Sequence, residues 1–236
     1  TIRSQAYKGH PLPNVVYLDI NKALENDEGT VVKRDTPPDP ITKIAITNSF
    51  GMPSQSPEYL MEDIKRANDG LQDGQVLVVS VVGGFCEERD FVEDYVYTAN
   101  LAKAAGAKIV EANFSCPNVS TGQGSLYLDE KSVRLITSKL AEALGDTPLI
   151  IKVASFQDPK VMEAVLLAAA RGGARAVSGI NTISKKVVDR NGRFPFGECR
   201  PSAGVCGAPI RQTAVNFVRE ARKTIEKEKL DLQLVG

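Results

Sequence analysis

From Gln75 onward, short apolar runs rich in β-branched residues alternate with longer amphipathic stretches. This pattern is typical of βα units around a parallel sheet, whose strands are buried on both faces. The apolar runs predict strands at residues 76–82, 108–114, 149–153, 176–180 and 232–235. The pattern therefore predicts an α/β fold for this part of the chain.

The stretches between the predicted strands carry helix signals. Between Phe91 and Ala102, apolar residues recur at steps of three and four, and Gly106 follows them as a stop signal. A second helix is expected to begin at Asp158-Pro159, where Asp158 offers a capping oxygen and Pro159 has no N–H group to leave unpaired. That helix should end at Gly172, before the next strand.

The first seventy residues have a different character. They are rich in proline and contain a charge-rich stretch over residues 25–35. This composition predicts loops, and only residues 44–46 have the pattern of a short strand. We expect residues 14–43 to form a loop excursion or insertion.

Length and composition narrow the class of protein. The 236 residues are near the roughly 250 of a single α/β barrel, so one domain is expected. The 29 basic residues balance the 29 acidic ones, which excludes a strong electrostatic footprint for nucleic acid or an anionic membrane. Four cysteines without a CxxC pair and a single histidine indicate no metal site. The absence of a recognisable leader or long apolar span favours the cytoplasm, although residue 1 is Thr and an excised leader stays an alternative.

Polar residues lie at the carboxyl ends of three neighbouring predicted strands. Asn113 lies near the end of the second strand and Cys116 follows that strand, Lys152 lies in the third, and Asn181-Thr182 follow the fourth. In barrels and open α/β sheets, ligands bind at this edge. An ammonium in an apolar strand needs an anionic or strongly accepting partner. Two partners stay open for the Lys152 ammonium: a bound ligand, or a buried carboxylate such as Glu111 in an ion pair.

Other candidate residues have ordinary structural interpretations beside functional ones. Cys116 is either a small buried residue or an exposed thiol, and the nearby amides Asn113 and Asn118 favour the exposed loop. Asn48 occurs in a segment of turn residues. The segment AGVCG, residues 203–207, precedes a predicted helix near Pro209, where its amides would suit a phosphate.

The segment NFSCPNV, residues 113–119, closely resembles the active-site loop of the dihydroorotate dehydrogenases, flavin enzymes of pyrimidine synthesis. Five further segments resemble that family in the same order: GHPLP (9–13), ITNSFGMP (46–53), IKV (151–153), INT (180–182) and AGVCG (203–207). The resemblance implies a (β/α)8 barrel of the TIM type that binds FMN at its carboxyl-terminal mouth. It also implies a soluble, cytoplasmic enzyme of the class with a cysteine base.

The resemblance implies a role for each matching residue. Cys116 would be the base that removes a proton from dihydroorotate while hydride passes to FMN, and residues 119–126 would form a lid. The substrate-binding residues would be Asn48, Phe50, Gly51, Met52, Asn113, Asn118, Asn181 and Thr182. The cofactor-binding residues would be Lys152, Asn113, Ile180, Gly204 and Gly207. The resemblance also implies a homo-oligomer, for which a dimer is one option, and an iron–sulfur electron-transfer subunit as a partner.

The chain departs from the family pattern in several places. The first barrel strands and the last strand of the family would fall outside it, so we expect residues 1–236 to form one FMN-binding barrel domain that is incomplete at both ends. Cysteine replaces serine in AGVCG. Two alternatives stay open: a related pyrimidine-degrading flavin reductase, whose loop has CPH in place of CPN, and a flavin-free relative without catalysis. The electron acceptor is open between fumarate, NAD and another oxidant.

Overall fold

The computed structural model describes residues 16–19, 30–35, 43–48, 54–84, 86–115 and 126–236. These residues fall into two compact units. The first unit takes its described residues from Met52–Ile180 and Phe217–Gly236, and the second takes them from Gly9–Gly51 and Asn181–Asn216.

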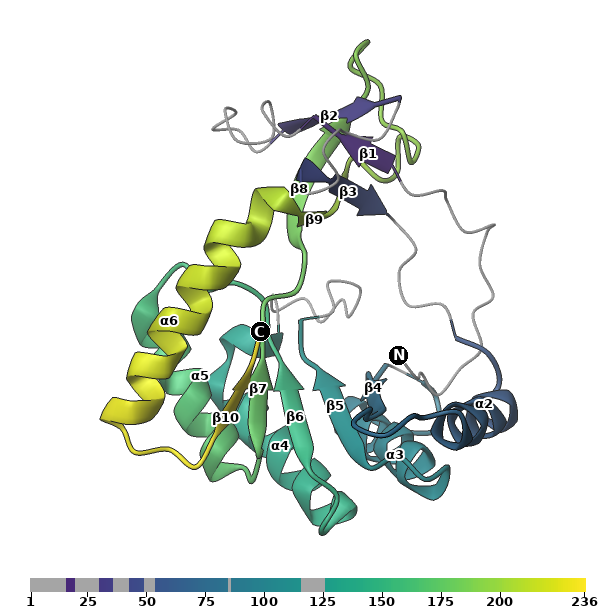
Figure 1. The fold of residues 1–236 in the computed structure, drawn as a ribbon, viewed down its shortest axis with the longest axis vertical. Coiled ribbons are helices and arrows are strands. Elements are labelled where there is room, and N and C mark those ends of the chain that lie inside the picture. Colours follow the sequence, from purple (N-terminus) through teal and green to yellow (C-terminus); the bar gives the residue numbers. More distant parts are fainter. Residues whose placement is uncertain (1–15, 20–29, 36–42, 49–53, 85, 116–125) are drawn as a thin grey trace. The chain divides into compact units, whose positions relative to one another are not determined.

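The first unit is built around a parallel sheet with strand order β10-β7-β6-β5-β4 (Figure 1). Its elements in chain order are α2 (Pro57–Asp69), β4 (Val78–Val81), α3 (Phe91–Ala104), β5 (Ile109–Asn113), the short helix η2 (Leu126–Leu128), α4 (Glu130–Leu144), β6 (Leu149–Lys152), α5 (Pro159–Arg171), β7 (Ala176–Ser178), most of α6 (Arg211–Lys227) and β10 (Gln233–Val235). The five strands expected from the apolar runs are confirmed.

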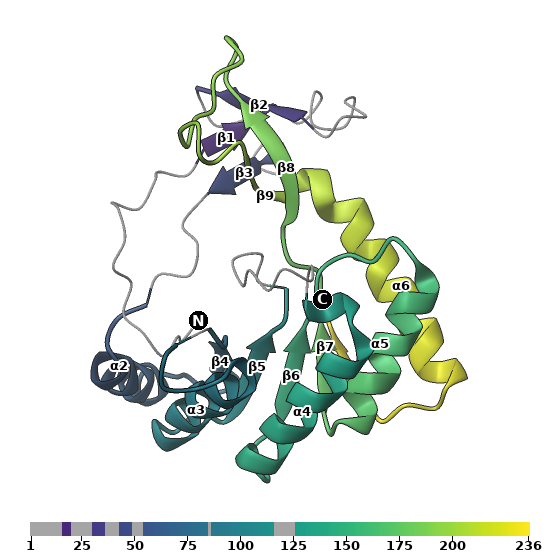
Figure 2. The same ribbon diagram turned by 180° about the vertical axis from the view of Figure 1, so that it is seen from behind.

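Successive side chains along each strand point to opposite faces of the sheet, and the two faces have different surroundings. One face of the sheet packs against helices α3, α4, α5 and α6, which cover it in both views (Figures 1 and 2). The strands contribute Val81, Val110, Ile151 and Val177 to this core, and all four are fully buried. We call the opposite face of the sheet the inner face. By the two-residue period of a strand it carries Ser80, Glu111, Asn113, Lys152 and Ser178.

The helix ends follow the capping signals of the sequence. The Asp158 carboxylate accepts the N–H of Lys160 at 2.8 Å, and Pro159 occupies the first turn of α5. At α3, Asp90 and Glu93 form a reciprocal capping box. Both helices begin where the sequence predicts, and Gly172 caps the end of α5.

The second unit is a small closed barrel with strand order β1-β2-β8-β9-β3. Its strands are β1 (Val16–Leu18), β2 (Thr30–Arg34), β3 (Ala45–Asn48), β8 (Ile183–Val188) and β9 (Ser202–Gly207), and the short helix η3 (Ala208–Ile210) follows them. Among the described strand pairs of this unit, β2–β8 is the one parallel pair. A separate apolar cluster that includes Leu18, Val31 and Val205 fills this barrel.

The structure differs from the expectation for the first seventy residues. The short strand expected at residues 44–46 is confirmed as β3, but β1 and β2 also form within residues 14–43, and α2 follows Ser56. The segment AGVCG forms strand β9, and the helix expected near Pro209 follows it as η3. Strands of three to six residues show no clear period, and β2 pairs with β8, about 150 positions away in the sequence, so the local pattern did not reveal them.

The packing of α4 generates a stability prediction. Leu140 is 0% exposed in the core beneath α4, whereas Leu135 on the same helix is 52% exposed. Leu140→Ala should lower the free energy of unfolding by about 2–5 kcal/mol, because it removes buried methyl groups and leaves a cavity. Leu135→Ala should change it by no more than about 0.5 kcal/mol. Urea denaturation of both variants checks this, and equal losses would contradict the packing described.

Candidate active site at the carboxyl edge of the parallel sheet

The candidate site lies where β5, β6 and β7 end. Asn113 is the last residue of β5 and is the register partner of Lys152, the last residue of β6. Lys152 is in turn the register partner of Ser178, the last residue of β7. The structure therefore brings the two strand-end residues Asn113 and Lys152 side by side, as their positions in the sequence suggested.

Asn113 is held rigidly. It is 3% exposed, and its backbone carbonyl accepts the Tyr95 hydroxyl at 2.8 Å. Its side-chain oxygen accepts the N–H and the hydroxyl of Ser115, at 3.2 Å and 3.0 Å. Within the described part of the chain, its amide N–H groups have no hydrogen-bond partner. The side chain is therefore fixed as a hydrogen-bond donor.

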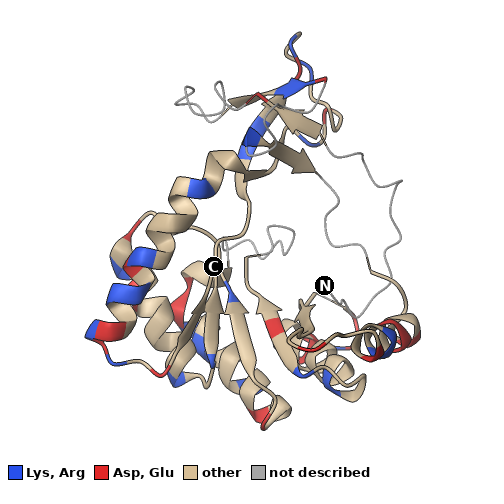
Figure 3. Cartoon of the chain, in the orientation of Figure 1, with Lys and Arg blue, Asp and Glu red and all other residues tan. Residues whose placement is uncertain are grey.

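Lys152 is half-buried on the inner face. Among the described residues its ammonium forms no ion pair and no hydrogen bond, so the expected alternative of an ion pair with Glu111 is not observed there. Charged residues lie mainly on the helices, while the strands of the parallel sheet are mostly uncharged (Figure 3). A half-buried cation in this setting is suited to an anionic or strongly accepting ligand.

Glu111 makes different contacts, which the sequence did not reveal. Its two carboxylate oxygens accept the Ser80 hydroxyl at 3.0 Å and the Ser178 hydroxyl at 2.9 Å. Ser80 is on β4 and Ser178 is on β7, so one carboxylate joins side chains from three strands across the inner face. The only sequence signal was an acidic residue two positions before Asn113, which the strand period places on the same face.

A buried carboxylate organises the loop that follows β4. Asp94 is 0% exposed, and it accepts the backbone N–H of Gly84 at 2.8 Å and the guanidinium of Arg89 at 3.2 Å. Arg89 also lies over the ring of Tyr97, 4.0 Å from its centroid. Since this loop follows the carboxyl end of β4, Asp94 shapes the same edge of the sheet. Sequence analysis missed Asp94 because it lies within a regular helical stretch.

The loop after β6 is anchored by aromatic residues. The Tyr127 hydroxyl donates to the carbonyl of Ser155 at 3.0 Å, and burial raises the pKa of Tyr127. The Tyr127 ring also meets the edge of Phe156, with centroids 5.2 Å apart. Phe156 stacks in turn on Phe217 of α6. These contacts fix the segment that follows Lys152.

Within the second unit, the expected site residues Asn48, Thr182 and Gly204 come together. Asn48 ends β3 and is the register partner of Gly204 in β9. A side chain at Gly204 would collide with Thr182, and one at Gly207 would collide with the carbonyl of Ile44. Gly207 also has a φ of 86°, which favours glycine. Packing within the barrel therefore already requires both glycines, and a role for them in cofactor binding stays a prediction.

Cys206 lies between these glycines. Its thiol donates to the carbonyl of Ile46 at 3.4 Å, and burial raises its pKa. A thiol with a raised pKa is a poor nucleophile near neutral pH, so Cys206 is the less reactive kind of cysteine.

Several expected site residues lie outside the described part of the chain. They are Cys116, Asn118, Phe50, Gly51, Met52 and the proposed lid before Leu126. Asn181 and Thr182 follow β7 in the chain and belong to the second unit, together with Gly204 and Gly207, whereas Ile180 belongs to the first.

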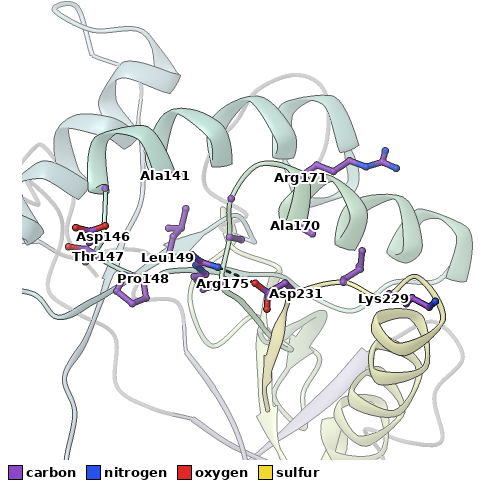
Figure 4. Close-up of a pocket in the computed structure, with 14 residues that line it drawn as sticks. Ala141, Asp146, Thr147, Pro148, Leu149, Ala170, Arg171, Arg175, Lys229 and Asp231 are labelled. Atoms are coloured by element: carbon purple, nitrogen blue, oxygen red, sulfur yellow. Dashed lines mark hydrogen bonds and ion pairs between the residues drawn. The ribbon is translucent and has the colours of Figure 1, made fainter.

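A cavity of about 500 Å³ in the first unit is at the other end of the strands. Leu149 begins β6, and Arg175 and Asp231 come shortly before β7 and β10. Figure 4 shows Arg175 and Asp231 joined by an ion pair, with N and O 3.1 Å apart. In barrels this end serves stability rather than catalysis, so the candidate active site is at the carboxyl edge.

In the described ranges, every helix is too short or too polar to cross a membrane.

The structure resembles a solved protein of known fold. The crystal structure of DHODH from Eimeria tenella in complex with ferulenol matches with a TM-score of 0.69 at 15% sequence identity, over 99% of this chain and 61% of that chain. The parallel sheet and its helices therefore represent part of a (β/α)8 barrel, and the expected fold class is confirmed.

Sequence comparison gives the same family. The dihydroorotate dehydrogenase of Dictyostelium discoideum is 44% identical over 244 residues, covering 100% of this chain and 66% of that protein. The catalytic subunit of dihydroorotate dehydrogenase B (NAD(+)) of Fusobacterium nucleatum is 30% identical over 190 residues, covering 78% of this chain and 57% of that protein. The chain thus spans just under two thirds of the length of the Dictyostelium protein and a smaller share of the length of the Fusobacterium protein. The model of the dihydroorotate dehydrogenase family matches residues 33–233, and the chain belongs to that family.

Proposed function

We propose that this protein oxidises dihydroorotate to orotate, in pyrimidine biosynthesis, with FMN as the acceptor of hydride. The observation that carries the proposal is the register pairing of Asn113 with Lys152 at the carboxyl edge of the sheet. Asn113 lies three residues before Cys116. Family membership supports the same activity, since the relatives from Dictyostelium and Fusobacterium are named for it.

The described residues suit a flavin. The ring system of FMN presents carbonyl oxygens and ring nitrogens, and its reduced form carries negative charge. Asn113 offers fixed amide N–H groups and Lys152 offers an ammonium without an ion pair among the described residues. We propose that Lys152, Asn113, Ile180, Gly204 and Gly207 hold the cofactor, with Lys152 stabilising the reduced ring.

Cys116 is the proposed base. A thiol is suited to proton removal near neutral pH when its pKa is moderate or lowered. The amides Asn48, Asn113, Asn118 and Asn181 would hold the substrate's carboxylate and imide edges, because an amide both donates and accepts hydrogen bonds. Thr182, with the segment of Phe50, Gly51 and Met52, would complete that pocket.

The cellular setting is part of the proposal. We propose a cytoplasmic enzyme that works as a dimer. Its reduced flavin would be reoxidised either by a small oxidant such as fumarate or through an iron–sulfur partner subunit. Relatives named for each route match this chain: the Fusobacterium relative is a catalytic subunit named for NAD(+), and a relative from Limosilactobacillus reuteri is named for fumarate.

Cys116→Ser tests the base. In the full-length protein this variant should keep FMN and orotate binding nearly intact, while reduction of the flavin by dihydroorotate slows by about 10²–10⁴-fold. The residual rate should rise with pH, because a serine hydroxyl is almost fully protonated near neutral pH and is a far poorer base than a thiolate. Stopped-flow bleaching of the flavin at several pH values measures both effects.

The other cysteines are matched controls for this substitution. Cys86→Ser, Cys199→Ser and Cys206→Ser should retain the rate of flavin reduction, since none of them lies in the amide-flanked segment. Equal reduction rates in the unaltered protein and Cys116→Ser would show that Cys116 is not the base.

Lys152→Ala tests the cofactor site. Loss of the ammonium should weaken FMN binding about ten- to a hundredfold, because hydrogen bonds to charged groups contribute about 1.5–3 kcal/mol. Lys160 is an exposed lysine at the start of α5, and Lys160→Ala should bind FMN as the unaltered protein does. Fluorescence titration with FMN gives both affinities, and unchanged binding in Lys152→Ala would refute this role.

A further inference from the structure

We infer that Glu111 is a positioning residue that places a negative charge beside Lys152 and thereby lowers the reduction potential of the bound flavin. The inference rests on the proposed function, because it concerns a flavin at the carboxyl edge of the sheet. It assigns a role to a carboxylate on the inner face that neither the sequence motifs nor the proposed chemistry uses.

The first support is the position of the Glu111 carboxylate. Glu111 pairs in register with Ile150, which lies two residues before Lys152 on β6. The side chains of Glu111 and Lys152 both project from the inner face. The carboxylate extends across β6 to the hydroxyl of Ser178, which is the register partner of Lys152. The carboxylate therefore crosses β6 on the face that also carries Lys152, although the two groups form no ion pair among the described residues.

The second support is the way in which the carboxylate is held. Each oxygen accepts one hydroxyl hydrogen bond, from Ser80 at 3.0 Å and from Ser178 at 2.9 Å. Two donors on two oxygens suit the acceptor-only character of an ionised carboxylate. The two serines come from strands on either side of β5 and β6, so the charge has a defined position on the inner face.

The hydrogen bonds of Glu111 to Ser80 and Ser178 tie strands together, but the uncharged amide of a glutamine could also form two such bonds, so folding does not require a charge here. Glu111 is half-buried, and even partial removal of a charged group from water is costly. The opposite face of the same strand is packed with Val110 and Ala112, both fully buried. A carboxylate on the inner face, beside a cation and two residues before Asn113, is consistent with an electrostatic role at the site.

The sign of the effect follows from charge. A reduced flavin carries more negative charge than an oxidised one, so a nearby cation favours reduction and a nearby carboxylate opposes it. Lys152 and Glu111 would thus act in opposite directions on the same equilibrium. Their balance would keep the flavin reducible by dihydroorotate and still able to pass its electrons on.

Glu111→Gln in the full-length, FMN-loaded protein tests this inference, because it removes the charge and nearly preserves the shape. The ratio of affinities for reduced and oxidised FMN should rise about tenfold, a shift of about +30 mV in the two-electron midpoint potential. Glu111→Asp retains the charge but shortens the side chain, and its potential should stay close to that of the unaltered protein. Spectroelectrochemical titration gives the potentials, and thermal unfolding gives the stabilities.

A structural role predicts the opposite pattern. If Glu111 only ties the strands together, Glu111→Asp should be at least as damaging to thermal stability as Glu111→Gln, and neither should move the potential. That result would overturn the inference. A potential that shifts in Glu111→Gln but not in Glu111→Asp would support it.

A second pair of variants tests separately whether the two charges oppose each other. Lys152→Gln should lower the potential, and Lys152→Gln/Glu111→Gln should return it toward the unaltered value, because opposite charges are then removed together. Equal potentials in the single and double variants would refute the role of Glu111. An unaltered protein that binds no FMN would instead overturn the proposed function, and the inference with it.

Discussion

Backbone pairing between β5 and β6 sets Asn113 opposite Lys152, and the alternation of side chains along both strands then decides which residues meet the helices. Val110, Ala112 and Ile151 face α3 to α5 and fill the core. Glu111, Asn113 and Lys152 occupy the intervening positions. A shift of one residue in this register would bury the charged groups and expose the apolar ones, so the core and the candidate site constrain the same alignment.

Polar groups at this edge form hydrogen bonds with other groups of the protein. Tyr95 donates to the carbonyl of Asn113, and the same tyrosine is fully buried between the rings of Phe91 and Phe114. Asp94 holds the loop after β4 through Gly84 and Arg89. An unmet hydrogen bond in such surroundings is costly, so these contacts fix the strand ends in place. Rigid strand ends are what a site that relies on orientation requires.

The sequence predicted the parallel strands and the beginnings of α3 and α5, because their apolar periods and caps are local signals. It also placed Asn113 and Lys152 at one edge, since parallel strands share their carboxyl ends. The small barrel was not predicted, because strands as short as β1 depend on partners far away in the chain. The partners of Glu111 were hidden for the same reason: Ser80 and Ser178 are 31 and 67 positions away from it. The role of Cys116 came from resemblance to a family and from no physical pattern.

Packing accounts for both glycines of the segment AGVCG. The likeness of this segment to a family segment suggests a phosphate site, yet Gly204 has no room for a side chain beside Thr182, and Gly207 combines a positive φ with the nearby carbonyl of Ile44. Substitution of either glycine would disturb the strand before it could report on a cofactor. Lys152 differs from these glycines, because its ammonium forms no ion pair with the described residues and so no such contact of the fold depends on it. The charged groups of the inner face are therefore better suited than the glycines to separating cofactor binding from folding in this chain.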